Sequence, residues 1–113
     1  MKTEAKSSRD VLLQADDLNG AVRFYETVLG FRANHRSETL VGLETGSFCL
    51  YVEKGPSYGP VLEFYVADIA ATKQALIAAG GRIENEDPSI PRCYVRDPFG
   101  LIFNLAERKP EPA

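Results

Sequence analysis

The chain repeats one pattern of secondary structure, and this repeat constrains its fold more than any other feature. In each half a short apolar strand is followed by an Asp, an amphipathic segment that ends at glycine, and three further strands. Asp17 and Asp68 are placed as helix N-caps, because an Asp side chain can accept hydrogen bonds from the first free N–H groups of a helix. A βαβββ unit that occurs twice predicts one α+β domain of two modules within the 113 residues.

The apolar periodicity and the Gly, Pro, Asn and Asp breaks between segments predict the individual elements. In a first module over about 10–54, we expect a strand at 11–15, a helix from Leu18 to Gly30, and strands within 31–37, 39–45 and 47–54. In a second module over about 61–107, we expect a strand at 61–66, a helix from Ile69 to Gly80, and strands within 81–86, 91–97 and 100–107. The Gly- and Pro-rich segment 55–60 is predicted as a linker, and polar tails are predicted at 1–9 and 108–113.

Composition excludes several classes of function. The chain is 44% hydrophobic and 26% charged, which is typical of a globular protein, and its net charge of −3 argues against a nucleic-acid binder. No apolar run approaches the ~18 residues of a membrane helix, and the polar N-terminus has no signal-peptide core. Two separated cysteines make neither a disulfide framework nor a CxxC motif. We therefore expect a cytoplasmic protein that contacts neither nucleic acid nor membrane.

Two stretches resemble the signature segments of a known superfamily. They are "ADDLNGAVRFYETVLGF" at 15–31 and "YVRDPFGLIFNLAE" at 94–107. They are similar to those of the vicinal oxygen chelate superfamily, which includes glyoxalase I, extradiol dioxygenases, and fosfomycin- and bleomycin-resistance proteins. The resemblance covers about residues 10–107. It implies a cup-shaped, eight-stranded mixed sheet with helices on its outer face, a ligand cavity inside, and modules that pair within a chain or across a homodimer.

The resemblance also implies where a metal would bind, near the start of each module's first strand and on its last strand. Counted from the capping Asp residues and from the turn glycines Gly46 and Gly100, the four positions are Asp10, Leu50, Val61 and Asn104. Leu and Val carry no donor atoms, whereas a divalent cation needs three or four converging donors. We therefore predict no metal and no cofactor, as in the bleomycin-resistance branch. A shifted site built from His35, Glu63 and Asp10 is left open.

Strand alternation, anchored on this resemblance, separates the cavity lining from the core. The core set packs under the helices and is strongly apolar: Val11, Leu13, Leu62, Phe64, Phe103 and Leu105. The opposite set mixes apolar walls with a few polar groups, which is typical of a small-molecule pocket. The ligand-binding residues predicted in this way are Gln14, Phe48, Leu50, Glu63, Tyr65, Ile102 and Asn104. The resemblance to the fosfomycin-resistance branch implies two more, Arg92 and Tyr94, at five and three residues before the turn Asp. The further cavity-facing positions are Asp10, Leu12, Val52, Val61 and Ala106.

Two classes of function stay open. The first is a metal-free protein that binds an organic ligand in the cup, with resistance by sequestration as one outcome. The second is a glyoxalase- or dioxygenase-like enzyme (lyase, isomerase or oxygenase), with a shifted metal site or with metal-free acid/base chemistry. In that case Glu63 and Tyr94 are the candidate catalytic residues. A purely structural alternative also stands, in which Glu63 and Arg92 form an ion pair and the tyrosines only pack.

Overall fold

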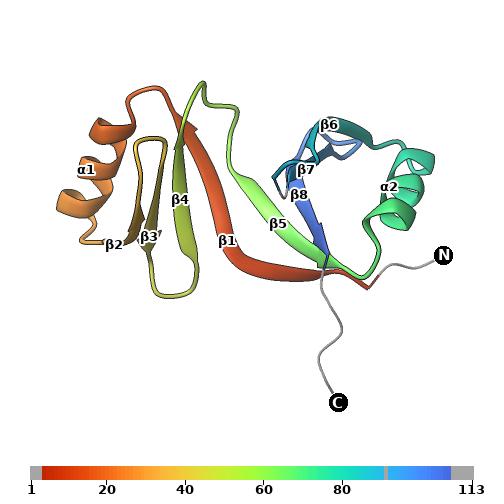
Figure 1. The fold of residues 1–113 in the computed structure, drawn as a ribbon, viewed down its shortest axis with the longest axis horizontal. Helices are drawn as coiled ribbons and strands as arrows, with labels where there is room; N and C mark the ends of the chain where they lie inside the picture. The colour runs from red at the N-terminus through yellow and green to blue at the C-terminus, as the bar shows by residue number, and fades with distance from the viewer. Residues whose placement is uncertain (1–3, 91, 108–113) are drawn as a thin grey trace, which may run out of the picture. The chain divides into compact units, whose positions relative to one another are not determined.

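Two compact units, each with strands and one helix, make up the chain (Figure 1). A computed structural model describes residues 4–90 and 92–107. One unit is Arg9–Val61, and the other runs from Leu62 onward and includes the N-terminal segment up to Ser8. The α+β class and the repeated βαβββ order are therefore confirmed. Neither helix in the described residues has the length and apolar character needed to cross a membrane.

The first βαβββ module is a mixed four-stranded sheet with one helix. Its elements are β1 (Lys6–Ala15), α1 (Leu18–Val28), β2 (Arg32–Arg36), β3 (Leu40–Glu44) and β4 (Cys49–Lys54). The strand order is β2-β3-β4-β1. Strands β2, β3 and β4 pair antiparallel, so β4 runs in the same direction as β2. The helix crossover from β1 to β2 keeps the chain direction, and β1 therefore lies parallel to β4.

The second module repeats this topology. Its elements are β5 (Val61–Val66), α2 (Ile69–Ala78), β6 (Arg82–Asp87), β7 (Arg92–Arg96) and β8 (Ile102–Glu107). The order β5-β8-β7-β6 places β5 parallel to β8, as β1 is to β4. Strands β6, β7 and β8 pair antiparallel. The internal repeat seen in the sequence is therefore a repeat in three dimensions.

Both helices begin at the predicted aspartates. The Asp17 carboxylate accepts a hydrogen bond from the Gly20 N–H (2.9 Å), and Asp68 accepts one from the Ala71 N–H (3.1 Å). Each bond satisfies an N–H group that the first helical turn leaves without a partner. The chain leaves α1 through Gly30, whose φ of 74° is readily adopted only by glycine.

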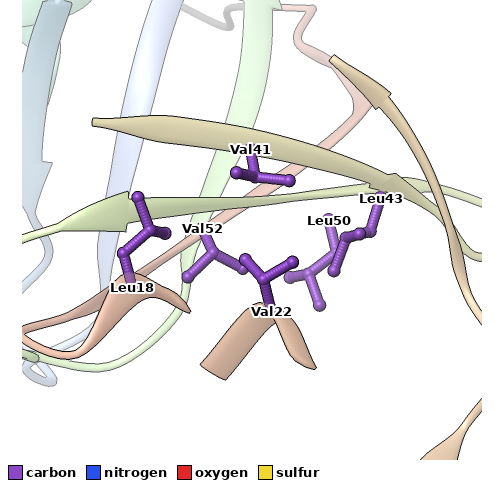
Figure 2. Packing of buried hydrophobic residues seen from close by; sticks show 6 residues of the cluster. All are labelled: Leu18, Val22, Val41, Leu43, Leu50 and Val52. Atoms are coloured by element: carbon purple, nitrogen blue, oxygen red, sulfur yellow. The ribbon is translucent and has the colours of Figure 1, made fainter. Parts of the chain in front are cut away.

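The core of the first module lies between α1 and its sheet (Figure 2). Leu18 and Val22 of α1 pack against Val41, Leu43, Leu50 and Val52 from β3 and β4. Leu43 and Val52 have no more than 1% of their surface exposed. This cluster shows which side of β3 and β4 faces the helix, and therefore which side faces away from it.

The second module has a smaller core. Its buried residues are Val66, Cys93, Val95 and Leu105, all on strands, whereas the buried residue of α2 is Thr72. The Thr72 hydroxyl donates to the Asp68 carbonyl over 2.7 Å, so it satisfies itself within the helix. A cavity of about 250 Å³ is lined by side chains of α2, β5 and β8.

The first strand is longer than its apolar residues predict. β1 begins at Lys6, so that 6–9 of the predicted polar tail are strand. Strand pairing uses backbone groups and does not require apolar side chains, and Arg9 is further held by Glu44 (3.0 Å) and the Gly46 carbonyl (3.2 Å). The predicted tail at 108–113 lies outside the described residues.

Candidate functional site

In each module we call the side of the sheet that faces away from its helix the ligand-side face. In the second module, Phe103 and Leu105 pack with the cluster beside α2. The alternate residues of β8 therefore point to the ligand-side face: Ile102, Asn104 and Ala106. Register confirms the same phase on β5, where Glu63 is opposite Asn104 and Tyr65 is opposite Ala106.

Asn104 links the backbone of β7 to the carboxylate of Glu63. Its Oδ1 accepts a hydrogen bond from the Cys93 N–H over 2.7 Å, and its Nδ2 donates to Glu63 Oε2 over 2.9 Å. Asn104 is 6% exposed, whereas Glu63 is half-buried. The buried amide thus holds an accessible carboxylate in one position on the sheet.

Arg92 and Tyr94 lie together on β7. The Arg92 guanidinium carbon is 4.8 Å from the centre of the Tyr94 ring, a cation–π geometry, and Tyr94 is 4% exposed. Arg92 also lines a cavity of about 570 Å³, together with Glu86, Ile90, Ala106 and Glu107. Arg92 lines that cavity, whereas Glu63 and Asn104 do not. The predicted ligand-binding residues of this module are therefore not gathered in one cavity.

In the first module the predicted phase of β4 is wrong. Leu50 and Val52 pack against α1 in the core instead of facing the ligand side (Figure 2). Phe48 lies outside the strand, in the β3–β4 loop, and is 37% exposed. The residues of β4 that share the ligand-side face are Cys49, Tyr51 and Glu53, paired with Asp10, Leu12 and Gln14.

The error comes from the lengths of two hairpin loops. In β3–β4 the Thr45 N–H bonds to the Phe48 carbonyl (3.0 Å) around a two-residue loop. In β7–β8 the Asp97 N–H bonds to the Leu101 carbonyl (2.8 Å) around three residues. Gly46 and Gly100 are therefore not equivalent, and a count of four from each glycine is one residue short in the first module. The structural counterpart of Asn104 is Tyr51, because Leu12 pairs with Tyr51 as Glu63 pairs with Asn104.

Tyr51 lies across a glycine on the neighbouring strand. A Cβ atom on Gly42 would come within 2.9 Å of the Tyr51 ring and 2.6 Å of Asn34 Oδ1. Asn34 in turn donates to the Cys49 sulfur over 3.4 Å. Sequence reasoning missed Tyr51 and Asn34. Gly42, a glycine inside a predicted strand, was the signal that a large side chain approaches there.

Gln14 takes the predicted ligand-side position and has a partner that was not predicted. It is 6% exposed, and its Nε2 donates to the Tyr58 hydroxyl over 3.0 Å. Tyr58 belongs to the connector 55–60, which the sequence marks only as a linker. A contact between two residues that are 44 positions apart cannot be predicted from the local sequence pattern.

The residues present do not fit a divalent metal. With Tyr51 in place of Leu50, the four implied positions are Asp10, Tyr51, Val61 and Asn104, and Val61 has no donor atom. Asn104 offers only a neutral amide oxygen that already accepts from the Cys93 N–H, which makes it a weaker ligand than a carboxylate. In residues 4–90 and 92–107, no three His, Cys, Asp or Glu side chains gather as a metal site would require. His35, the histidine considered for a shifted site, is exposed on β2.

The buried thiol of the second module, Cys93, has a raised pKa. Burial raises the pKa of Cys93, and the nearby charge of Glu86 raises it further, although Lys73 opposes this. Lys73 is itself paired with Glu86 over 2.6 Å. A thiol with a raised pKa is a poor nucleophile at neutral pH, so Cys93 acts here through its backbone N–H.

Comparison with known proteins agrees with the fold. The family model described as a glyoxalase-like domain matches residues 10–106. A lactoylglutathione lyase of Haemophilus influenzae is 28% identical over 122 residues, covering 87% of this chain and 90% of the relative.

Two solved structures share the fold at low identity. A glyoxalase/bleomycin resistance protein/dioxygenase superfamily member from Vibrio splendidus 12B01 superposes with a TM-score of 0.67 at 19% identity, over 95% of this chain and 100% of the other. A Mn(II)-bound glyoxalase from Novosphingobium aromaticivorans gives 0.65 at 15% identity, over 99% of this chain and 44% of that longer one. With a family model that spans nearly the whole chain, the protein belongs to the glyoxalase-like family of the vicinal oxygen chelate superfamily.

Proposed function

We propose that the protein binds a small organic ligand on the ligand-side face, and that Glu63 recognises a hydrogen-bond donor or a positive charge on that ligand. The observation that carries this proposal is the chain of contacts from the Cys93 N–H through Asn104 to Glu63. A carboxylate that served only solubility would not need a buried amide to fix its direction. A fixed, half-buried carboxylate beside apolar strand residues is the kind of orienting group that small-molecule sites contain.

The test is whether Glu63 controls what the protein carries. Small molecules released from the natively purified protein are identified by mass spectrometry, for the natural chain and for Glu63→Gln. Gln has the same shape but no charge, so we expect the bound compound to be lost or strongly depleted. Glu38→Gln, in the exposed turn before β3, is the matched control and should retain the compound. Equal retention by Glu63→Gln would contradict the proposal.

A second function is favoured by the similarity to a lactoylglutathione lyase. Here Glu63 would act as a general acid or base, positioned by Asn104, and the ligand would be a substrate. Tyr94, the other candidate, is buried beneath Arg92 and is less accessible. Incubation with lactoylglutathione, followed by the loss of thioester absorbance, tests this. Turnover that Glu63→Gln abolishes and Glu38→Gln retains would favour the enzyme.

Our proposal includes metal-free binding, a cytoplasmic location and a homodimer. Metal-free binding is supported by Val61, which has no donor atom, and by Asn104, whose neutral amide oxygen already accepts from the Cys93 N–H. Elemental analysis after mild purification tests it directly. One equivalent of a divalent metal per chain, lost on Asp10→Ala, would overturn this part of the proposal and leave the ligand-binding part to its own test.

A further inference from the structure

Gln14 has one half of its amide satisfied and the other half buried without a partner. Its Nε2 donates to the Tyr58 hydroxyl over 3.0 Å. Its Oε1 is buried and accepts no hydrogen bond from any residue of the described chain. Gln14 as a whole is 6% exposed, so neither bulk water nor a ligand reaches this oxygen unless the side chains that cover it move.

A purely structural role would be served better by another residue. A buried carbonyl without a hydrogen bond destabilises the fold, and most such groups in native proteins have a partner. Leu12 and Leu13 are the neighbouring residues on β1, so this strand accommodates leucine readily. A glutamine with an unsatisfied oxygen therefore points to a partner that is bound only part of the time.

Tyr58 takes up the donor half of the Gln14 amide. It is carried by the connector, whose first residue is tied to the strand by a hydrogen bond from the Gly55 N–H to the Ala15 carbonyl (3.1 Å). In this structure its hydroxyl accepts from Nε2 of Gln14, and the atom without a partner is the acceptor Oε1. Tyr58 is 42% exposed, so part of the tyrosine also remains at the surface beside Gln14.

We propose that Gln14 is a specificity-determining residue whose Oε1 accepts a hydrogen bond from an uncharged donor on the ligand, an amide N–H or a hydroxyl, while Tyr58 holds the amide in the receptive orientation. This inference rests on the proposed ligand binding, but it concerns a different residue and a different chemical group from Glu63. Leu12 and Tyr51 share this face of the module, so the donor should be attached to an apolar or aromatic group.

The test uses two probes that differ in one group. N-methylbenzamide carries an N–H where methyl benzoate, of nearly the same shape, carries an ester oxygen. Each is titrated into the full-length chain and followed by NMR chemical shifts. We expect N-methylbenzamide to bind about tenfold more tightly, the effect of one hydrogen bond. In Gln14→Leu this preference should disappear, and in Tyr58→Phe, where the amide is no longer held, it should shrink.

Two further measurements separate the alternatives. Melting of Gln14→Leu should occur at the same or a higher temperature, because the substitution removes an unsatisfied buried oxygen, and water can replace the lost hydrogen bond at the hydroxyl of Tyr58, which is 42% exposed. A lower melting temperature with the probe preference intact would mean that an ordered water satisfies Oε1, and would overturn the proposal. Equal binding of the two probes by the natural chain, or binding of neither, would also overturn it. Glu63→Gln should keep the probe preference, so failure of the Glu63 proposal and failure of this one are distinguishable.

Discussion

The side-chain amide of Asn104 donates to the carboxylate of Glu63 over 2.9 Å, while its oxygen accepts from the Cys93 N–H over 2.7 Å. A strand asparagine among apolar residues is therefore not an isolated polar group. Both ends of its amide form hydrogen bonds, and together they link β7 to β5; we call this pair of hydrogen bonds the Asn104 strut. If the ligand site is as proposed, Asn104 acts on the ligand through Glu63 as a positioning residue.

Because of the Asn104 strut, we predict that Asn104→Leu lowers the free energy of unfolding. The substitution removes the acceptor of a buried N–H group and the donor to a half-buried carboxylate. Leaving a buried donor unsatisfied costs about 1–3 kcal/mol. Chemical denaturation should show a loss of that size in the free energy of unfolding. From the sequence alone one would expect Asn104→Leu to be neutral, as for an amide facing a wet cavity, and the Cys93 contact argues against that.

Asn104→Asp is the control for the strut. It keeps an oxygen for the Cys93 N–H but places a second carboxylate beside Glu63. We expect a loss of stability near neutral pH that diminishes in acid, because like charges raise the pKa of one carboxyl and its protonation relieves the repulsion. Identical losses for Asn104→Leu and Asn104→Asp at all pH values would contradict this assignment of the two bonds.

Glu84 predicts a specific acid sensitivity. It accepts from Arg82 (3.1 Å) and pairs with Arg96 (3.3 Å), and these two guanidinium groups hold the pKa of Glu84 below its ordinary value of 4.5. A carboxyl with a lowered folded-state pKa adds stability above pH 4.5 and loses it as pH falls through the folded value. In Glu84→Gln the decline in melting temperature below pH 4.5 should be shallower. Glu38→Gln is the control, and a decline unchanged by Glu84→Gln would contradict the argument.

Much of the fold is encoded locally and could be predicted from the sequence. Asp17 and Asp68 cap their helices because the capping interaction spans only three residues. Strand β5 runs over the predicted 61–66, and Asn104 lies on the predicted side of β8, because alternation along one strand is a local property. The family resemblance followed from these same segments.

What could not be predicted depends on contacts between distant segments. Leu50 was assigned to the wrong face because a two-residue and a three-residue loop look alike when each contains one glycine. A slip of one residue reverses every side chain of a strand. The pairing of Gln14 with Tyr58 and of Asn104 with Cys93 likewise follows only from the folded chain. Polar residues 6–9 belong to β1, although apolar periodicity does not reveal it.

The homodimer predicted from the family resemblance can be tested by sedimentation. A chain of 12.5 kDa should sediment at micromolar concentration as a species of about twice that mass. The expectation rests on pairing of modules around a ligand site. A chain that remains monomeric throughout the concentration range and still releases a bound compound would contradict it.

The corrected register of β4 leads to opposite predictions for two adjacent residues. Leu50 is 6% exposed and packs beneath α1, so Leu50→Trp overfills the core and should cost about 1–3 kcal/mol in the free energy of unfolding. Tyr51 is half-buried on the ligand-side face, so Tyr51→Leu should change stability less but deplete the compound released from the native protein. Denaturation and mass spectrometry on both variants check this. A stable Leu50→Trp that loses the compound, beside a Tyr51→Leu that keeps it, would return Leu50 to the ligand side and show that β4 is shifted by one residue from the register described.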